Sequence, residues 1–296
     1  MILSERNVDF TAFLLFFCFK NYSQKRFEFF GGLKLNGNDK TLITYRLVFE
    51  LSNNKINGYS ITDLGGDNET KNSISGTFDN KNKILEFKED DILYTKSTFS
   101  EKSFCFVNFS GKVKLNDKTT KIDGDFTGLY KNKRKCINGT ITLVGSERIY
   151  KVLNKVNNKI QKSKKLDVTT KAKANPISLL DSLKVNNLVK GQNLNVFVKS
   201  ESVEIEIFDS ENEDGDKINL YQDDRIILSN YTILNTKKRI PLFLSKGNHI
   251  FKIEALNQGD KGLNTVTIKI VDGERTFDLK TSLKSNEKAS ITFLKN

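Results

Sequence analysis

The architecture of this chain follows from one segment, Val203-Glu-Ile-Glu-Ile-Phe-Asp-Ser-Glu-Asn-Glu-Asp-Gly-Asp-Lys-Ile-Asn-Leu-Tyr221. Apolar and polar side chains alternate from Val203 to Phe208 and again from Lys217 to Tyr221. Alternation with a period of two is typical of a strand with one buried and one solvated face. The polar residues between the two runs are typical of a turn. The segment therefore predicts two antiparallel strands within an all-β fold.

The turn between these strands is densely acidic, although the whole chain has a net charge of +12. Its carboxylates are Asp209, Glu211, Glu213, Asp214 and Asp216. Oxygen ligands of this kind suit Ca²⁺, and Gly215 lets the backbone turn around an ion. The spacing is not that of an EF-hand, because Tyr221 stands where the Glu at the twelfth position belongs. We predict an irregular Ca²⁺ loop, completed by Asn257 or Asn264.

Two other interpretations of the acidic turn stay open. In the first, the turn is an acidic hairpin in which Asp209 and Asp216 cap backbone amides while the other carboxylates face water. In the second, two of the carboxylates form a glycosidase pair, which requires an acid and a base roughly 5–10 Å apart.

Alternating strands continue through the rest of the C-terminal block, over residues 181–296. Val203/Ile205/Ile207, Phe251/Ile253/Ala255 and Val266/Ile268/Ile270 repeat the same period. Turn signals such as Lys246-Gly-Asn248 and Asp272-Gly273 separate the runs. Many short strands in a domain of this size predict a β-sandwich.

Several short elements of this block carry a resemblance. They are Glu206-Ile-Phe-Asp209, Glu213-Asp-Gly-Asp-Lys-Ile-Asn-Leu220, Ser245-Lys-Gly-Asn248, Glu254-Ala-Leu-Asn-Gln-Gly259, Leu263-Asn-Thr265 and Ile268-Lys-Ile270. In these elements the block resembles a recurrent module of exported proteins in Bacteroidetes-type bacteria, where it often stands at the C-terminus. The resemblance covers the C-terminal block alone. It implies a fold and an exported protein, and it implies no activity.

The N-terminal block, over residues 25–148, consists of short strand-like runs separated by turns rich in Asn, Asp and Gly. Examples are Leu42–Leu51, Asn72–Phe78, Ile84–Phe87, Phe104–Leu115, Lys121–Tyr130 and Cys136–Val144. A meander of about eight or nine strands tends to close on itself. We therefore predict a small barrel or a strongly curved sandwich. The chain contains 22 Phe, so we expect a filled barrel; a hollow barrel that carries a small apolar ligand is the alternative.

The two blocks are joined by residues 149–180. Apolar residues recur at helical spacing at Ile149, Val152 or Leu153, Val156 and Ile160. Lysines occupy the opposite face of that helix. We predict a short helix followed by a flexible basic linker. A basic amphipathic helix that rests on an anionic surface is the alternative.

The N-terminus predicts export. The apolar run Phe10–Phe19 is too short to span a bilayer, and the polar segment after it ends in Ser23-Gln24, an ending similar to signals of the same bacterial group. We interpret residues 1–24 as a signal peptide, with a buried first strand as the alternative. The mature protein is then periplasmic or secreted, and no further stretch is long and apolar enough for a membrane helix.

Removal of a signal peptide leaves two cysteines, Cys105 and Cys136, both in strand-like runs of the N-terminal block. An even number of cysteines in an oxidising compartment predicts a disulfide between them. Two separate buried thiols are the alternative. With only one histidine in the chain, the pair does not suggest a zinc site.

Motifs of known chemistry do not stand out in the sequence. It shows no nucleophile elbow and no phosphate-binding loop, and the single histidine, His249, lies in an alternating strand where we expect it to face solvent. The basic charge favours an anionic partner, although no nucleic-acid reader motif accompanies it.

We therefore predict a non-enzymatic binding protein of the envelope or secreted fraction, whose partner is a protein or an anionic envelope polymer. A carbohydrate-acting hydrolase or carbohydrate-binding accessory protein that uses the acidic turn is one alternative. A carrier of a small apolar ligand in the N-terminal barrel is the other.

Overall fold

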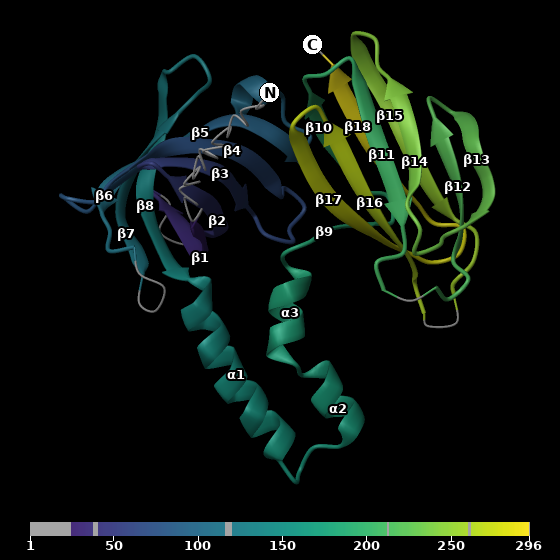
Figure 1. Cartoon of the computed structure of the whole chain (residues 1–296), viewed down its shortest axis with the longest axis horizontal. Helices are drawn as coiled ribbons and strands as arrows, with labels where there is room; N and C mark the ends of the chain where they lie inside the picture. The colour runs from purple at the N-terminus through teal and green to yellow at the C-terminus, as the bar shows by residue number, and fades with distance from the viewer. Residues whose placement is uncertain (1–24, 38–40, 116–119, 212, 260–261, 296) are drawn as a thin grey trace, which may run out of the picture.

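The computed structural model describes residues 25–37, 41–115, 120–211, 213–259 and 262–295. These residues form a β-barrel, a helical hairpin and a β-sandwich, in that order along the chain (Figure 1). The all-β prediction is confirmed. The predicted signal peptide, residues 1–24, lies outside the described residues.

The barrel is an antiparallel meander. Its strands are β1 (Lys25–Leu35), β2 (Leu42–Ser52), β3 (Lys55–Thr62), β4 (Thr70–Asp79), β5 (Ile84–Thr95), β6 (Phe106–Lys112), β7 (Lys121–Leu129) and β8 (Lys135–Gly145). Each strand pairs with the next, and β8 pairs with β1, so the sheet closes. The β2–β3 turn is encoded locally by Asn53 and Asn54, which take positive φ angles of 49° and 63°.

One half of the barrel is filled with aromatic rings, as the sequence predicted. Phe29 stacks on Phe49 with ring centroids 5.8 Å apart, and Phe27 lies 5.4 Å from Phe49. Phe87 and Phe109 form a second pair at 5.4 Å. The prediction does not hold for the other half, where a cavity remains.

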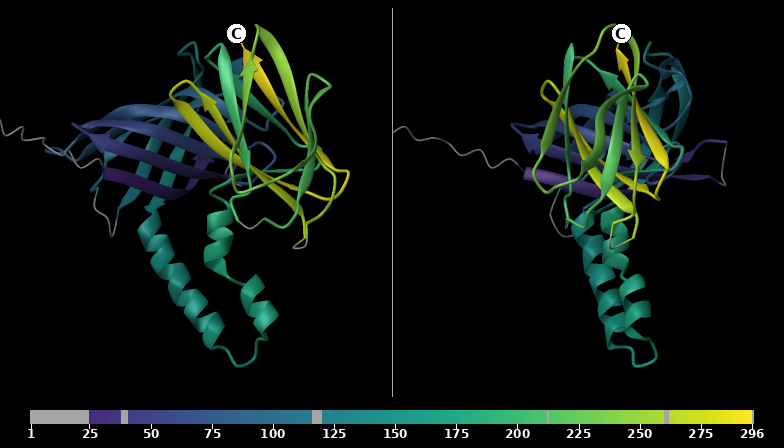
Figure 2. Two further views of the ribbon diagram at one scale, coloured as in Figure 1. Left: turned by 45° about the vertical axis from the view of Figure 1, so that its right-hand side comes forward. Right: turned by 90° about the vertical axis from the view of Figure 1, so that its right-hand side faces the viewer.

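A helical hairpin follows the last barrel strand, made of α1 (Ser146–Lys162), α2 (Val168–Lys173) and α3 (Pro176–Ser182). Figure 2 shows that α1 and α2 project away from both β domains. Where the sequence predicted a flexible linker, the chain forms two further short helices. The Asp167 carboxylate explains the first of them, because it accepts the backbone N–H of Thr170 and caps α2.

The C-terminal domain is the predicted β-sandwich. Its strands are β9 (Asn186–Val189), β10 (Asn193–Val198), β11 (Ser202–Phe208), β12 (Lys217–Gln222), β13 (Arg225–Thr232), β14 (Lys238–Phe243), β15 (Gly247–Ala255), β16 (Asn264–Asp272), β17 (Arg275–Leu283) and β18 (Lys288–Lys295). One sheet has the order β13-β12-β15-β18-β10 and the other the order β14-β11-β16-β17-β9. The alternating residues Ile205, Phe251 and Ile268 meet in the core between the sheets.

Barrel and sandwich are joined by backbone pairing. Strand β10 of the sandwich pairs antiparallel with the end of β5, so one continuous sheet runs through both domains. Tyr94 of β5 packs in the core of the sandwich, where its ring centroid lies 6.2 Å from that of Phe277. The two cores therefore share a strand.

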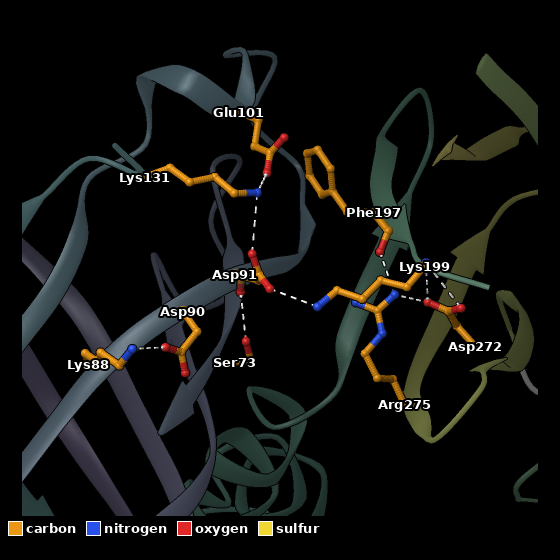
Figure 3. A network of polar contacts seen from close by, with 10 residues as sticks. All are labelled: Ser73, Lys88, Asp90, Asp91, Glu101, Lys131, Phe197, Lys199, Asp272 and Arg275. Atoms are coloured by element: carbon orange, nitrogen blue, oxygen red, sulfur yellow. Dashed lines mark hydrogen bonds and ion pairs between the residues drawn. The ribbon is translucent and has the colours of Figure 1, made fainter. Parts of the chain in front are cut away.

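Charged side chains surround this junction (Figure 3). The Asp91 carboxylate of β5 pairs with Lys199 of the sandwich at 2.9 Å and with Lys131 of the barrel at 3.4 Å. On the sandwich side, the Asp272 carboxylate accepts the backbone N–H groups of Lys199 and Ser200. These contacts fix the chain on both sides of the shared strand.

The Cys105–Cys136 disulfide is present, as predicted. It ties the chain just before β6 to the start of β8 across β7, with a sequence separation of 31. The backbone of Gly128 passes so close that a Cβ there would lie 2.4 Å from the Cys105 sulfur. Glycine is therefore required beneath the crosslink.

The first prediction concerns this crosslink. We expect the double variant Cys105→Ser/Cys136→Ser to lose about 3–4 kcal/mol of unfolding free energy, because the unfolded chain regains its freedom. Urea denaturation measures the loss of unfolding free energy. The wild-type protein under reducing conditions lacks the same crosslink and should lose a similar amount. A denaturation midpoint unchanged by either treatment would contradict the expectation.

Candidate functional site

The strongest candidate site is a cavity of about 440 Å³ at one end of the barrel. This end, which we call the mouth, is formed by the β1–β2, β3–β4, β5–β6 and β7–β8 connections. A volume of this order is typical of small-molecule sites. A more open hollow of about 560 Å³ lies over β4–β7, where Ser75, Glu86 and Asp125 contribute to its lining. The mouth differs from that hollow in enclosing buried polar groups.

Most of the cavity wall is apolar. It includes Leu33, Ile43, Phe106, Phe126 and Ile137, which come from five different strands. Such a wall favours an apolar ligand, because contact with it removes apolar surface from water.

Two large apolar side chains lie at the rim of the mouth. Leu42, at the start of β2, and Phe99, in the β5–β6 connection, are each 69% exposed. Apolar residues this exposed beside a cavity suit the entry of an apolar molecule.

A carboxyl group, Glu89, lies at the buried side of this cavity. The Glu89 Oε1 atom accepts hydrogen bonds from the Tyr45 hydroxyl at 2.9 Å and the Ser60 hydroxyl at 2.5 Å. Its Oε2 atom accepts the backbone N–H of Val107 at 2.7 Å. Burial raises the pKa of Glu89, and these hydrogen bonds oppose the rise. Burial also raises the pKa of Tyr45 well above its usual value, which keeps that hydroxyl a donor.

Beside Glu89, the side chain of Asn72 has an unmet hydrogen-bond acceptor. Asn72 lines the same cavity and is only 5% exposed. Its side chain helps to oppose the rise in the pKa of Glu89, but its Oδ1 atom has no hydrogen-bond partner among the described residues. A buried acceptor without a donor costs about 1–3 kcal/mol. An unsatisfied acceptor therefore lies within the wall of the cavity.

Irregularities in the β4–β5 pairing determine which side chains of β5 face the barrel interior and which face outward. Leu85, Phe87 and Glu89 alternate into the barrel, and the register then shifts between Ser73 and Ile74. The resulting bulge directs Asp91 outward to the sandwich, where strict alternation would have turned it into the barrel. A second shift between Lys71 and Asn72 precedes the outward turn of Tyr94.

The sequence raised a hollow barrel as an alternative, but it did not predict Glu89 or Asn72 as residues of a site, although it held a partial signal. The alternation of Leu85 and Phe87 extends to Glu89 and places a carboxylate on the inner face. The charged run Lys88–Asp91 hides that alternation.

The acidic turn of the sandwich is held mainly by backbone amides. The Asp209 carboxylate accepts the N–H of Glu211 at 2.7 Å. Asp216 is almost fully buried and accepts the N–H groups of Gly259 at 2.9 Å and Thr265 at 2.7 Å. Desolvation raises the pKa of Asp216, and the nearby carboxylate of Asp214 adds to the rise. Capping by Asp209 and Asp216 is therefore what the structure shows.

The other carboxylates of the turn have separate neighbours. Glu211 pairs with Lys280 at 2.5 Å, and Glu213 accepts the backbone N–H of Asn235 at 2.6 Å. The Asp214 Oδ1 atom is buried without a hydrogen-bond partner in the described chain. No three His, Cys, Asp or Glu side chains converge as a metal site would require, as far as the described residues go. Calcium binding by Asp209, Glu211, Glu213, Asp214 and Asp216 stays a prediction.

The sequence suggested that His249 faces solvent, but in the structure its side chain contacts two neighbouring residues. Its Nδ1 atom lies 3.0 Å from the Asp223 carboxylate, and its Nε2 atom lies 3.2 Å from the Ser245 hydroxyl. These distances resemble a Ser-His-Asp triad. However, Nε2 also lies 3.0 Å from the Ser245 carbonyl oxygen, which only accepts hydrogen bonds. Because Nε2 must donate to that oxygen, it has no lone pair for a serine proton, and the arrangement acts as a structural clamp.

Comparisons of the chain with protein-family models, curated proteins and solved structures find no match. The resemblance of the C-terminal block to an exported bacterial module therefore stays a prediction. Within the described chain, none of the helices has the length and apolar character needed to cross a membrane.

The second prediction follows from the His249 clamp. The hydrogen bond to Asp223 raises the pKa of His249 above its usual value of 6.5. The clamp's contribution to stability is therefore fully present below pH 6.5 and is lost as the pH rises through the folded pKa. Because the chain has 1 His, its single imidazole NMR signal reports this pKa directly. We expect Asp223→Asn to lower it; a folded pKa at or below 6.5 in the wild type would contradict the clamp.

The third prediction concerns Glu89 and pH. Because its folded pKa is raised above 4.5, the folded state holds this proton more tightly than the unfolded state. The unfolding free energy therefore falls as the pH rises from about 4.5 through the folded pKa. We expect Glu89→Gln to lack this fall in urea titrations, whereas Glu86→Gln, on the outer face of β5, retains it. If the unfolding free energies of the wild type and of Glu89→Gln changed with pH in the same way, the expected rise in the pKa of Glu89 would be ruled out.

Proposed function

We propose that this protein is a non-enzymatic binding protein that takes a small, largely apolar molecule into the mouth of its barrel. The observation that carries the proposal is a mostly apolar cavity whose wall holds buried Glu89 and an Asn72 Oδ1 atom that has no hydrogen-bond partner among the described residues. A few fixed polar groups in an apolar pocket are the usual pattern of a small-molecule site. The proposal selects the ligand carrier from the alternatives raised by the sequence.

The polar groups of the mouth also define the head of the ligand. Asn72 Oδ1 and the Glu89 oxygens are acceptors, so the ligand supplies a hydrogen-bond donor, such as a hydroxyl or an amine. No described cation pairs with Glu89, and a ligand ammonium would stabilise its ionised form. A ligand carboxylate would instead meet a buried carboxyl group and an unsatisfied acceptor. We therefore propose alcohols and amines with an apolar body, and we propose that fatty acids are rejected.

The site supports recognition better than hydrolysis. Glycoside hydrolysis requires two carboxyl groups that flank the scissile bond. Of the two carboxyl groups that line the mouth, Glu89 is engaged by three hydroxyl and backbone donors, and Asp63 accepts the backbone N–H of Asn68. Both are used to hold the protein together.

An exported location is part of the proposal. The disulfide between Cys105 and Cys136 supports it, because such crosslinks persist in oxidising compartments. In the periplasm or outside the cell, a barrel with an open mouth meets small amphipathic molecules in solution. The mouth is proposed for a small molecule. A protein or an anionic polymer, as predicted from the sequence, would bind elsewhere on the surface.

The fourth prediction tests the mouth with a displacement assay. N-Phenyl-1-naphthylamine is an apolar fluorophore with one N–H donor, and we expect its emission to rise on binding. Dodecylamine and dodecanol should displace it at concentrations about tenfold or more below dodecanoate, since hydrogen bonds to charged groups contribute about 1.5–3 kcal/mol.

Variants test whether Glu89 and Asn72 determine the ligand preference. Glu89→Gln should abolish the preference for dodecylamine over dodecanoate, and Asn72→Leu should weaken both dodecylamine and dodecanol. Glu86→Gln is the matched control, because it makes the same chemical change on the outer face of β5, where Glu86 meets Ser110. Absence of binding by the wild type, or an equal response of Glu86→Gln and Glu89→Gln, would defeat the proposal.

A further inference from the structure

The helical hairpin, residues 146–182, carries a concentration of positive charge. Its segment 146–173 contains nine Lys and Arg against two Asp and Glu, a net charge of +7 out of +12 for the chain. In the described chain, Lys151, Lys155 and Lys159 form no ion pair. With Asp181 of α3 included, the whole hairpin has a net charge of +6, half of the net charge of the protein, on one projecting element (Figure 2).

The hairpin is a formed structure and not a loose tether. The Tyr150 hydroxyl of α1 donates to the Asp181 carboxylate of α3, and the Lys184 ammonium lies 4.6 Å from the Tyr150 ring. Nearer the tip, the Gln161 side chain donates to the Lys171 carbonyl of α2 at 3.5 Å. These contacts hold one side of α1 against α2 and α3, and they leave its other side to solvent.

The solvent side of α1 combines lysines with apolar side chains. Val152 and Val156 lie one turn apart and are 54% and 42% exposed. Lys151, Lys155 and Lys159 follow the same spacing beside them. Val168, at the start of α2, is 83% exposed. α1 has no buried residue, so these valines serve no core of this chain.

We propose that the hairpin docks the protein on a lipid bilayer that contains anionic headgroups. The positive charge is complementary to such a surface, and lysine ammoniums near it gain a favourable interaction. The exposed valines select a bilayer over a soluble polyanion, because an interfacial helix buries its apolar side chains among the headgroups. A polyanion would pair with the lysines and leave the valines in water.

Docking of the hairpin on a bilayer is a second activity, independent of ligand binding in the mouth. α1 begins after Gly145, at the end of β8 opposite to the mouth. Variants of the hairpin and variants of the mouth can therefore be measured separately in the same full chain.

The fifth prediction uses co-sedimentation of the full chain with phosphatidylcholine vesicles, with or without phosphatidylglycerol. We expect binding only to the vesicles that contain phosphatidylglycerol, and we expect it to weaken as salt screens the charges. Lys151→Glu/Lys155→Glu/Lys159→Glu should lower the partition coefficient by about a hundredfold or more. Val152→Ser/Val156→Ser should lower it by about three- to tenfold at unchanged salt dependence.

The control changes the net charge equally, away from the hairpin. Lys55→Glu/Lys238→Glu/Lys246→Glu alters three exposed lysines of the β domains and should retain most of the binding. An equal loss in both triple variants would overturn the proposal, because net charge alone would then explain binding. So would failure of the wild type to bind. Full binding by the valine variant, together with equally tight binding of the wild type to dextran sulfate, would assign the surface to a soluble polyanion instead.

Discussion

One strand, β5, has to satisfy two hydrophobic cores, and the rest of the structure depends on this constraint. Its first half places Leu85 and Phe87 inside the barrel, and its second half places Tyr94 inside the sandwich. A regular strand keeps each side chain on a fixed face of the sheet. The two register shifts opposite β4 adjust the faces locally, so that one strand serves both domains.

The same strand carries a buried carboxyl group, Glu89. Removing a carboxyl group from water is costly, and the cost falls when hydrogen bonds satisfy it. Tyr45, Ser60 and Val107 supply such bonds to Glu89 from three other strands. This network determines the position of the carboxyl group and lowers its cost, but it does not serve the Asn72 oxygen. Groups that remain unfavourable inside a folded protein are often those its function uses.

Much of the fold was predictable from local patterns, because each pattern has a local physical cause. The period-two alternation of Val203–Phe208 reflects one buried face, and the prediction of a sandwich followed from it. Asn53-Asn54 suits a turn with positive φ angles, and capping of the acidic turn by Asp209 and Asp216 was among the interpretations. The Cys105–Cys136 crosslink was predicted from the two cysteines that lie outside the predicted signal peptide.

The candidate site was not predictable in the same way. The pairing of β5 with β10 joins segments about a hundred residues apart in the chain, and no local pattern specifies it. A bulge inserts one residue into a strand without a distinct sequence signal, so the outward turns of Asp91 and Tyr94 could not be inferred. The size of the cavity depends on which side chains fill the barrel. The amino-acid composition does not determine this. The 22 Phe of the chain predicted a filled barrel, yet those of the barrel leave its mouth open.

α1 leaves the barrel at the end opposite to the mouth, and the shared strand explains how the two proposed activities can coexist. The pairing of β5 with β10 and the ion pairs of Asp91 fix the sandwich to the barrel near the mouth. The hairpin, in contrast, meets the β domains only near its two ends. Charge repulsion among the lysines of α1 therefore acts on a helix that contributes no buried residue. A basic arm of this kind can carry a net charge of +6 without weakening the barrel, whereas the same lysines on β5 would oppose the junction that holds the molecule together.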